Sequence, residues 1–135
     1  MFISKDTELI IRLLQLPGFG NKSTEIVANY IVENEAFDDV DIYSCIMYCI
    51  NKKCIKVKKE PSLLDIQNAI DKSNQIIDGS LKCNISIISK FDKDYPLILK
   101  NLIGNRGENT APLILNYKGN LSSLTNKQSI AIIGT

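Results

Sequence analysis

The stretch Ser129-Ile-Ala-Ile-Ile-Gly-Thr135 constrains the fold of this chain more than any other. Four consecutive apolar residues, 130–133, precede a glycine. A run that is apolar on both faces is typical of a strand in a parallel sheet covered by helices, because an antiparallel strand with one face in water would alternate. A glycine at the end of such a strand is a common place for a phosphate-binding turn. We therefore expect a buried strand here, with Gly134 at the start of a candidate phosphate-binding turn.

The hydrophobic period changes near residue 80, which predicts two parts. Up to that point apolar residues recur every three or four positions, as in helices that bury one face. The expected helices cover residues 6–16, 22–33, 39–53 and 62–78. Short Ile-rich or Leu-rich segments follow, with strands expected at 84–89 and 112–117 and short helices at 96–102 and 121–124. The predicted fold class is α plus α/β: a small helical domain over residues 1–82, then the first strands of a Rossmann-like domain over residues 83–135.

Capping signals set the expected ends of two helices. Asp6 or Thr7 is a suitable N-cap for the first helix. Ser62 with Asp65 three residues later resembles a capping box, although Glu or Gln is the usual partner. Gly79 is a plausible stop for the fourth helix, since glycine is common just after a helix end.

The charge balance excludes a strongly basic nucleic-acid-binding domain. The net charge is +1, with 10 Lys and Arg against 12 Asp and Glu in residues 1–82, and 6 against 3 in residues 83–135. Any contact with nucleic acid must therefore come from a local patch. No apolar run reaches the ~18–20 residues of a membrane span, and the N-terminus lacks the pattern of a signal peptide. We expect a cytoplasmic location.

The residue types favour neither a catalytic nor a metal site. The chain has no histidine, and Cys45, Cys49, Cys54 and Cys83 lack the paired C-x-x-C spacing of zinc sites. We interpret the four cysteines as free thiols that pack as small core residues. The carboxylates Asp92 and Asp94 have turn roles that suffice to explain them. We expect a protein that is not an enzyme and binds no cofactor or metal.

The segment Leu16-Pro-Gly-Phe-Gly20, between two predicted helices, has the form of a helix-hairpin-helix. Gly18 and Gly20 would let the backbone approach a phosphate, and the next helix would offer its unpaired amides. Lys22 could add a charge. The alternative is a tight turn with Phe19 packed in the core, and Glu25 with the acidic balance of this half favours it.

Two further features have functional and structural interpretations. The lysines at 52–59 could bind phosphates, but a solvated helix end whose lysines complement the helix dipole explains them better. No aromatic residue is interleaved with them, so base stacking there is unsupported. Tyr95 and Tyr117 could stack on bases, but packing beside their apolar neighbours is the better interpretation.

Three segments in a fixed order resemble one known family. They are Phe91-Asp-Lys-Asp-Tyr-Pro-Leu-Ile-Leu99, Ala111-Pro-Leu-Ile-Leu-Asn-Tyr-Lys-Gly-Asn-Leu121 and Ser129-Ile-Ala-Ile-Ile-Gly-Thr135. Together they closely resemble the start of the Rossmann-like domain of the DNA-processing family DprA, also called Smf. The helical part with Leu16-Pro-Gly-Phe-Gly20 resembles that family's N-terminal domain, which is similar to sterile-alpha-motif or helix-hairpin-helix domains. The resemblance covers almost the whole chain.

The resemblance implies binding of single-stranded DNA and help in loading the recombinase RecA during natural transformation, by a protein that is a homodimer at full length. In the family the DNA pocket follows the turn that Gly134 and Thr135 match and begins with an arginine. This chain stops before it, so we expect a fragment. Two alternatives remain open: a Rossmann-like nucleotide-binding hydrolase whose phosphate loop begins at Gly134, and a helical protein-interaction module without a DNA role.

Overall fold

A computed structural model describes residues 3–124 of the chain. The strand expected at 130–133 and the expected site residues Gly134 and Thr135 lie outside this range. The elements are α1 (Lys5–Leu14), α2 (Asn21–Glu33), α3 (Asp39–Asn51), α4 (Leu63–Lys82), β1 (Ser86–Ser89), α5 (Leu97–Lys100), β2 (Ile114–Tyr117) and the 3-10 helix η1 (Leu121–Leu124). The fold is mixed, with helices and a small antiparallel sheet.

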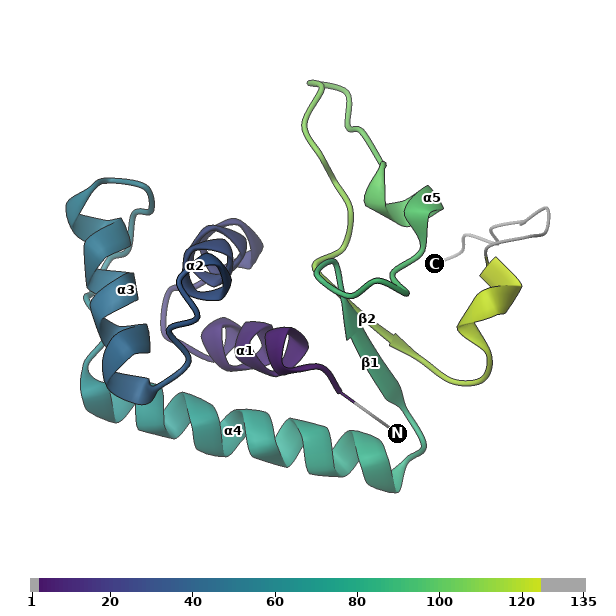
Figure 1. Cartoon of the computed structure of the whole chain (residues 1–135), viewed down its shortest axis with the longest axis horizontal. Coiled ribbons are helices and arrows are strands. Elements are labelled where there is room, and N and C mark those ends of the chain that lie inside the picture. The colour runs from purple at the N-terminus through teal and green to yellow at the C-terminus, as the bar shows by residue number, and fades with distance from the viewer. Residues whose placement is uncertain (1–2, 125–135) are drawn as a thin grey trace.

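The long helix α4 connects the two parts of the molecule. It runs along α1 and reaches from α3 to β1 (Figure 1). The helices α1 to α4 form a bundle around one hydrophobic core, to which Leu113, just before β2, also belongs. The largest fully buried apolar side chains are Leu9, Ile10, Leu13, Val27, Ile31 and Ile46. The segments expected to be helical up to residue 82 therefore share one core with the start of β2.

The two strands pair antiparallel, with Ser86 opposite Tyr117 and Ser89 opposite Ile114. Ile87 and Ile88 of β1 are buried, and β1 contacts both α1 and α4. A parallel arrangement needs a further strand, and the stretch 130–133 expected to supply it lies outside the described residues.

Two helix ends differ from the sequence-based expectation. Ser4, and not Asp6 or Thr7, caps α1: its Oγ accepts from the backbone N–H of Thr7 at 3.1 Å. Gly79 does not stop α4, which continues to Lys82. Asn84, at φ 54°, takes the left-handed position that glycine usually fills, and the Asn84 and Ile85 amides donate to the Leu81 and Ser80 carbonyls.

The capping box of α4 is confirmed. The Asp65 amide donates to Ser62 Oγ at 3.1 Å, and the Ser62 amide donates to Asp65 Oδ2 at 2.9 Å. The backbone hydrogen bond from Ser62 lowers the pKa of the Asp65 carboxyl, because it favours the charged form. This local pattern is specified by the sequence alone.

The cysteines divide into two pairs. Cys45 and Cys49 are buried in the helical core as free thiols, and burial raises the pKa of both. Cys54 and Cys83 are exposed, so the expectation that all four pack in the core is wrong for these two. Each follows the end of a long helix, where the chain turns at the surface. Between residues 3 and 124 no helix is long and apolar enough to cross a membrane.

Candidate nucleic-acid interface

The turn between α1 and α2 brings Gly18, Gly20 and Lys22 together at the surface. Gly18 has φ +79°, a conformation that favours glycine because a Cβ would be strained there. Gly20 is the N-cap of α2 and has an extended backbone, φ −103° and ψ −171°, that any residue adopts. Only Gly18 therefore requires glycine for its conformation. A Cβ added at either position would meet no described atom within 4 Å, so the turn faces open space.

The start of α2 can accept an anion. Gly20 has no side chain to cap the helix, and Asn21, Lys22, Ser23 and Thr24 include no acidic residue. The first amides of a helix lack intrahelical acceptors and carry the positive end of its dipole. Lys22 is exposed beside them. The alternative interpretation, a tight turn with Phe19 packed in the core, is also supported in part, because Phe19 is buried in the helical core.

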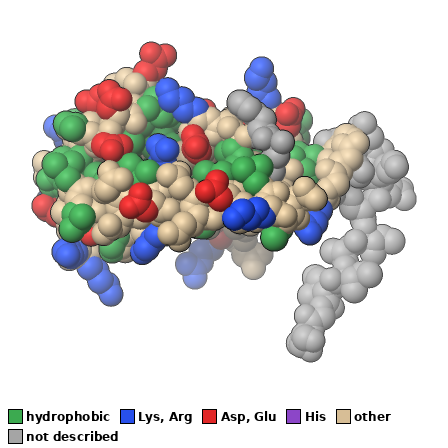
Figure 2. All heavy atoms as spheres, turned by 90° about the horizontal axis from the view of Figure 1, so that it is seen from below, with side chains coloured by type: hydrophobic (Ala, Val, Ile, Leu, Met, Phe, Trp, Pro, Cys, Tyr) green, Lys and Arg blue, Asp and Glu red, His purple; other side chains and the backbone are tan. Residues whose placement is uncertain are grey.

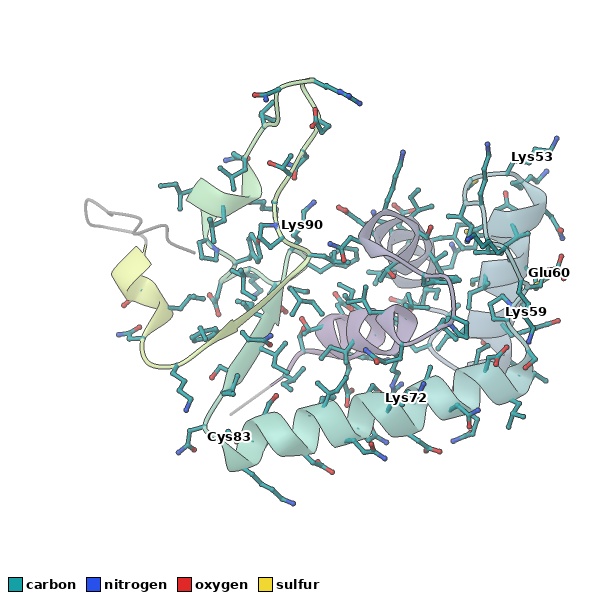
Figure 3. All side chains as sticks on the ribbon, turned by 180° about the vertical axis from the view of Figure 1, so that it is seen from behind. Lys53, Lys59, Glu60, Lys72, Cys83 and Lys90 are labelled. Atoms are coloured by element: carbon teal, nitrogen blue, oxygen red, sulfur yellow. The ribbon has the colours of Figure 1, made fainter. Side chains whose placement is uncertain are left out.

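Glu25, which counts against a phosphate contact in the sequence, is neutralised in the structure. Its Oε1 accepts from Lys90 Nζ at 2.7 Å, and Lys90 is itself largely buried, with 12% of its side chain exposed. Lys90 follows β1 directly (Figure 3). The ion pair therefore connects α2 to the sheet and removes one negative charge from the α2 surface.

Asp92 has a larger role than a turn. Its Oδ2 accepts from the Ser89 amide at 2.8 Å, as in a turn, and also lies within hydrogen-bond distance of the Thr7 hydroxyl on α1. Thr7 Oγ1 is 2.8 Å from Ser89 Oγ and accepts from Ser4 Oγ at 3.0 Å. Because Thr7 has a single hydroxyl proton, it donates to only one of these partners at a time. This network holds the N-terminal helix against β1.

The segments 91–99 and 111–121 meet around Tyr95. Its hydroxyl donates to the Pro112 carbonyl at 2.6 Å, and burial raises the pKa of this hydroxyl. Tyr95 is therefore packed against the rest of the chain, as the sequence predicted, and is not free to stack on bases. Tyr117 is half-buried and faces an open cleft of about 760 Å³. The cleft is lined by Lys93, Asp94, Tyr95, Leu97, Ile98, Tyr117, Gly119, Asn120, Leu121 and Ser122.

One aromatic pair is not apparent from the sequence. Tyr30 of α2 and Tyr48 of α3 stack with ring centroids 4.8 Å apart and planes 15° from parallel. Lys52 Nζ lies 5.8 Å from the centroid of the Tyr48 ring. Lys52 and Lys53 follow Tyr48 by four and five residues, which was a weak signal in the sequence. The contact with Tyr30 depends on how the two helices pack.

The described structure leaves the predicted site residues in two groups. Gly18, Gly20 and Lys22 lie on one turn, whereas Gly134 and Thr135 lie outside residues 3–124. Across that same range, no three His, Cys, Asp or Glu side chains are grouped so as to hold a metal ion. Searches against protein-family models, curated proteins and solved structures find no match to this chain.

Proposed function

We propose that this chain is the N-terminal part of a DNA-processing protein of the DprA type, which binds single-stranded DNA and assists the loading of RecA. The observation that carries the proposal is the hydrogen bond from the Tyr95 hydroxyl to the Pro112 carbonyl. It joins the two described segments on which the family resemblance depends. Residues of both segments also line one cleft, which supports their belonging to a single functional unit.

The proposal includes a finer description of the fold. The bundle of α1 to α4 corresponds to a helix-hairpin-helix or sterile-alpha-motif-like domain, and β1, α5 and β2 correspond to the opening of a Rossmann-like domain. The positive φ of Gly18 and the uncapped start of α2 support the first assignment. A further parallel strand at 130–133 would support the second.

In this proposal the α2 N-terminus contacts the DNA backbone. Gly18 permits the close turn, the first α2 amides donate hydrogen bonds to a phosphate, and Lys22 supplies a positive charge. Such contacts are independent of sequence because they involve only the backbone. Pairing of Glu25 with Lys90 offsets one negative charge on α2.

Gly20→Asp separates this function from a purely structural turn. An aspartate at the N-cap would satisfy the α2 amides and interact favourably with the helix dipole, so we expect the free energy of unfolding to rise by about 0.5 kcal/mol. The same carboxylate would repel a phosphate. We therefore expect Gly20→Asp to be more stable and to bind labelled oligothymidylate more weakly. Fluorescence anisotropy with the whole chain at low salt measures the binding. Gly20→Ser is the matched uncharged cap.

Lys22→Ala tests the charge. Loss of one phosphate contact should reduce the slope of log K against log salt by about 0.7 for a single strand. Unchanged affinity in both Lys22→Ala and Gly20→Asp would reject the α2 contact. RecA filament formation on single-stranded DNA, followed with and without the chain, tests the second half of the proposal.

A protein-interaction role for the helical domain is the second candidate, and one observation favours it. The large apolar side chains Leu63, Leu64, Ile76 and Leu81 of α4 are exposed. On the face covered by α4, hydrophobic side chains lie among charged side chains of both signs (Figure 2). A mixed surface of this kind suits a protein partner better than a polyanion. Absence of any DNA affinity at low salt would favour this role.

A further inference from the structure

The aromatic pair Tyr30–Tyr48 presents one ring to solvent beside a cation. Tyr48 is 42% exposed, although it stacks on Tyr30. Stacking fixes the Tyr48 ring in one orientation, so a ligand that packs on it meets a preorganised surface. Lys52 lies within reach of the same ring.

A cluster of lysines follows directly in the chain. The segment 52–60, here the lysine loop, carries five exposed lysines and one acidic residue, Glu60. Its lysines are Lys52, Lys53, Lys56, Lys58 and Lys59. The loop is held in place by buried Ile55 and by Pro61, which follows it. Lys53 and Lys59 project outward at the end of the molecule where Glu60 also lies (Figure 3).

The lysines begin at the end of α3 and do not lie within its last turn. The last turn of α3 contains no basic residue; α3 ends at Asn51, and Lys52 is its C-cap. Lys53 occupies the left-handed position with φ 59°, and the Lys53 and Cys54 amides donate to the Ile50 and Cys49 carbonyls. Glycine is the favoured residue at such a position. Lys53 therefore places a charged side chain at a backbone position where glycine would be less strained.

Exposed aromatic rings beside clustered cations match the chemistry of single-stranded nucleic acid. Cations bind successive phosphates, and a base stacks on an aromatic ring whatever its sequence. An acidic peptide would need only the lysines. A lipid surface would need apolar residues free to insert, whereas Ile55 of the loop is buried. A single-stranded nucleic acid uses both the ring and the charges.

We propose that Tyr48, supported by Tyr30, and the lysine loop form a binding site for single-stranded nucleic acid. A base stacks on the Tyr48 ring, and Lys52 and Lys53 contact the adjoining phosphates. This surface is separate from the α2 N-terminus: Tyr30 lies nine residues, or about 14 Å along the helix, from Asn21. The two sites would bind the same class of ligand, single-stranded nucleic acid, through different residues.

The test compares two oligonucleotides with the same number of phosphates, oligothymidylate and its abasic counterpart. Tyr48→Ala should weaken binding of the whole chain to oligothymidylate by roughly tenfold, because a stacked base is lost. Its affinity for the abasic strand should not change. Tyr48→Phe keeps the ring and should bind both strands as the natural chain does. Because the chain contains no tryptophan, quenching of its tyrosine emission by oligothymidylate is an independent readout.

Lys53→Gly tests the charges without a risk of misfolding. It removes one cation and relieves the left-handed backbone, so the denaturation midpoint should rise while both strands bind more weakly. The salt slope should fall by about 0.7. Lys72→Ala, on the exposed surface of α4 away from Lys53 (Figure 3), is the matched control and should leave binding unchanged.

Two results would overturn the site. One is an unchanged oligothymidylate affinity in Tyr48→Ala; the other is equal competition by polyglutamate, which would point to an acidic protein partner. Loss of binding in Gly20→Asp but not in Tyr48→Ala rejects this site and keeps the α2 contact. The reverse pattern rejects the α2 contact alone. Failure of the natural chain to bind any single strand rejects both.

Discussion

The helical bundle and the sheet side of the molecule differ in how they bury apolar residues. Ile10 and Ile46 of the bundle are 0% exposed, whereas Leu97 of α5 is 69% exposed. Against the described part of the chain, α5 buries no residue at all. The strand β1 contacts α1 and α4, and Leu113, just before β2, enters the helical core. The bundle thus supplies its own core, and the sheet side depends on that core.

Three contacts carry this dependence. The Thr7 hydroxyl meets Ser89 and Asp92, Leu113 packs among the helices, and Lys90 pairs with Glu25. Each joins residues distant in sequence. The division into domains at residues 82 and 83 therefore stays a prediction, and the following variants test how independent the two parts are.

Truncation in the bundle core should have the largest effect. Ile10→Ala leaves a cavity among fully buried side chains, and we expect the free energy of unfolding to fall by about 2–5 kcal/mol. Leu97→Ala is the matched change on the sheet side, where the removed atoms are already in water, and should stay within about 0.5 kcal/mol. Urea denaturation followed by circular dichroism measures both. Equal losses would show that α5 is packed as tightly as α1.

Removing the Thr7 hydroxyl should separate the two regions at a smaller cost. Thr7→Val keeps the shape but leaves Asp92 and Ser89 without this partner in a buried setting, which costs about 1–3 kcal/mol. Thr7→Ser retains the hydroxyl and is the control. We expect amide exchange to accelerate in β1 more than in α3. Equal acceleration in both would mean that the two regions unfold as one unit.

The capping box of α4 should give the smallest effect, and one that depends on pH. Hydrogen bonding lowers the folded pKa of Asp65, so its contribution is present above the ordinary value of 3.8 and is lost as the pH falls through the lowered folded pKa. Asp65→Asn should therefore lower the melting temperature near pH 7, and the difference should vanish in acid.

Ser62→Ala is the control for that titration, because the hydroxyl it removes accepts from the Asp65 amide at every pH. Its cost, about 1 kcal/mol, should persist in acid. A pH-independent difference for Asp65→Asn would show that its charge does not contribute to the α4 cap.

Local chemistry was predictable from the sequence, and long-range contacts were not. The four long helices, both strands and the Ser62–Asp65 box follow from periodicity and capping rules that act within a few residues. The error at Gly79 arose because Asn84 provides the same left-handed turn a few residues later. Thr7 looked like a cap because the sequence could not reveal Ser89 and Asp92, which reach it only through tertiary packing.

The candidate sites show the same limit. Gly18 and Lys22 were identifiable because their turn is local, whereas the Tyr30–Tyr48 stack requires α2 and α3 to be packed. The pairing of Glu25 with Lys90 reversed an argument drawn from charge alone. A count of charges cannot tell which of them are already paired.

The membership of Leu113 in the helical core has a consequence for the order of events during synthesis. The other buried members of this core lie between Leu9 and Ala69, so they are synthesised before Leu113. At roughly 5–20 residues per second, Leu113 follows a few seconds later. We expect the nascent bundle to have time to collapse with one position unfilled, and the arrival of β2 to close it. A chaperone that binds exposed apolar surface would meet its substrate in that interval.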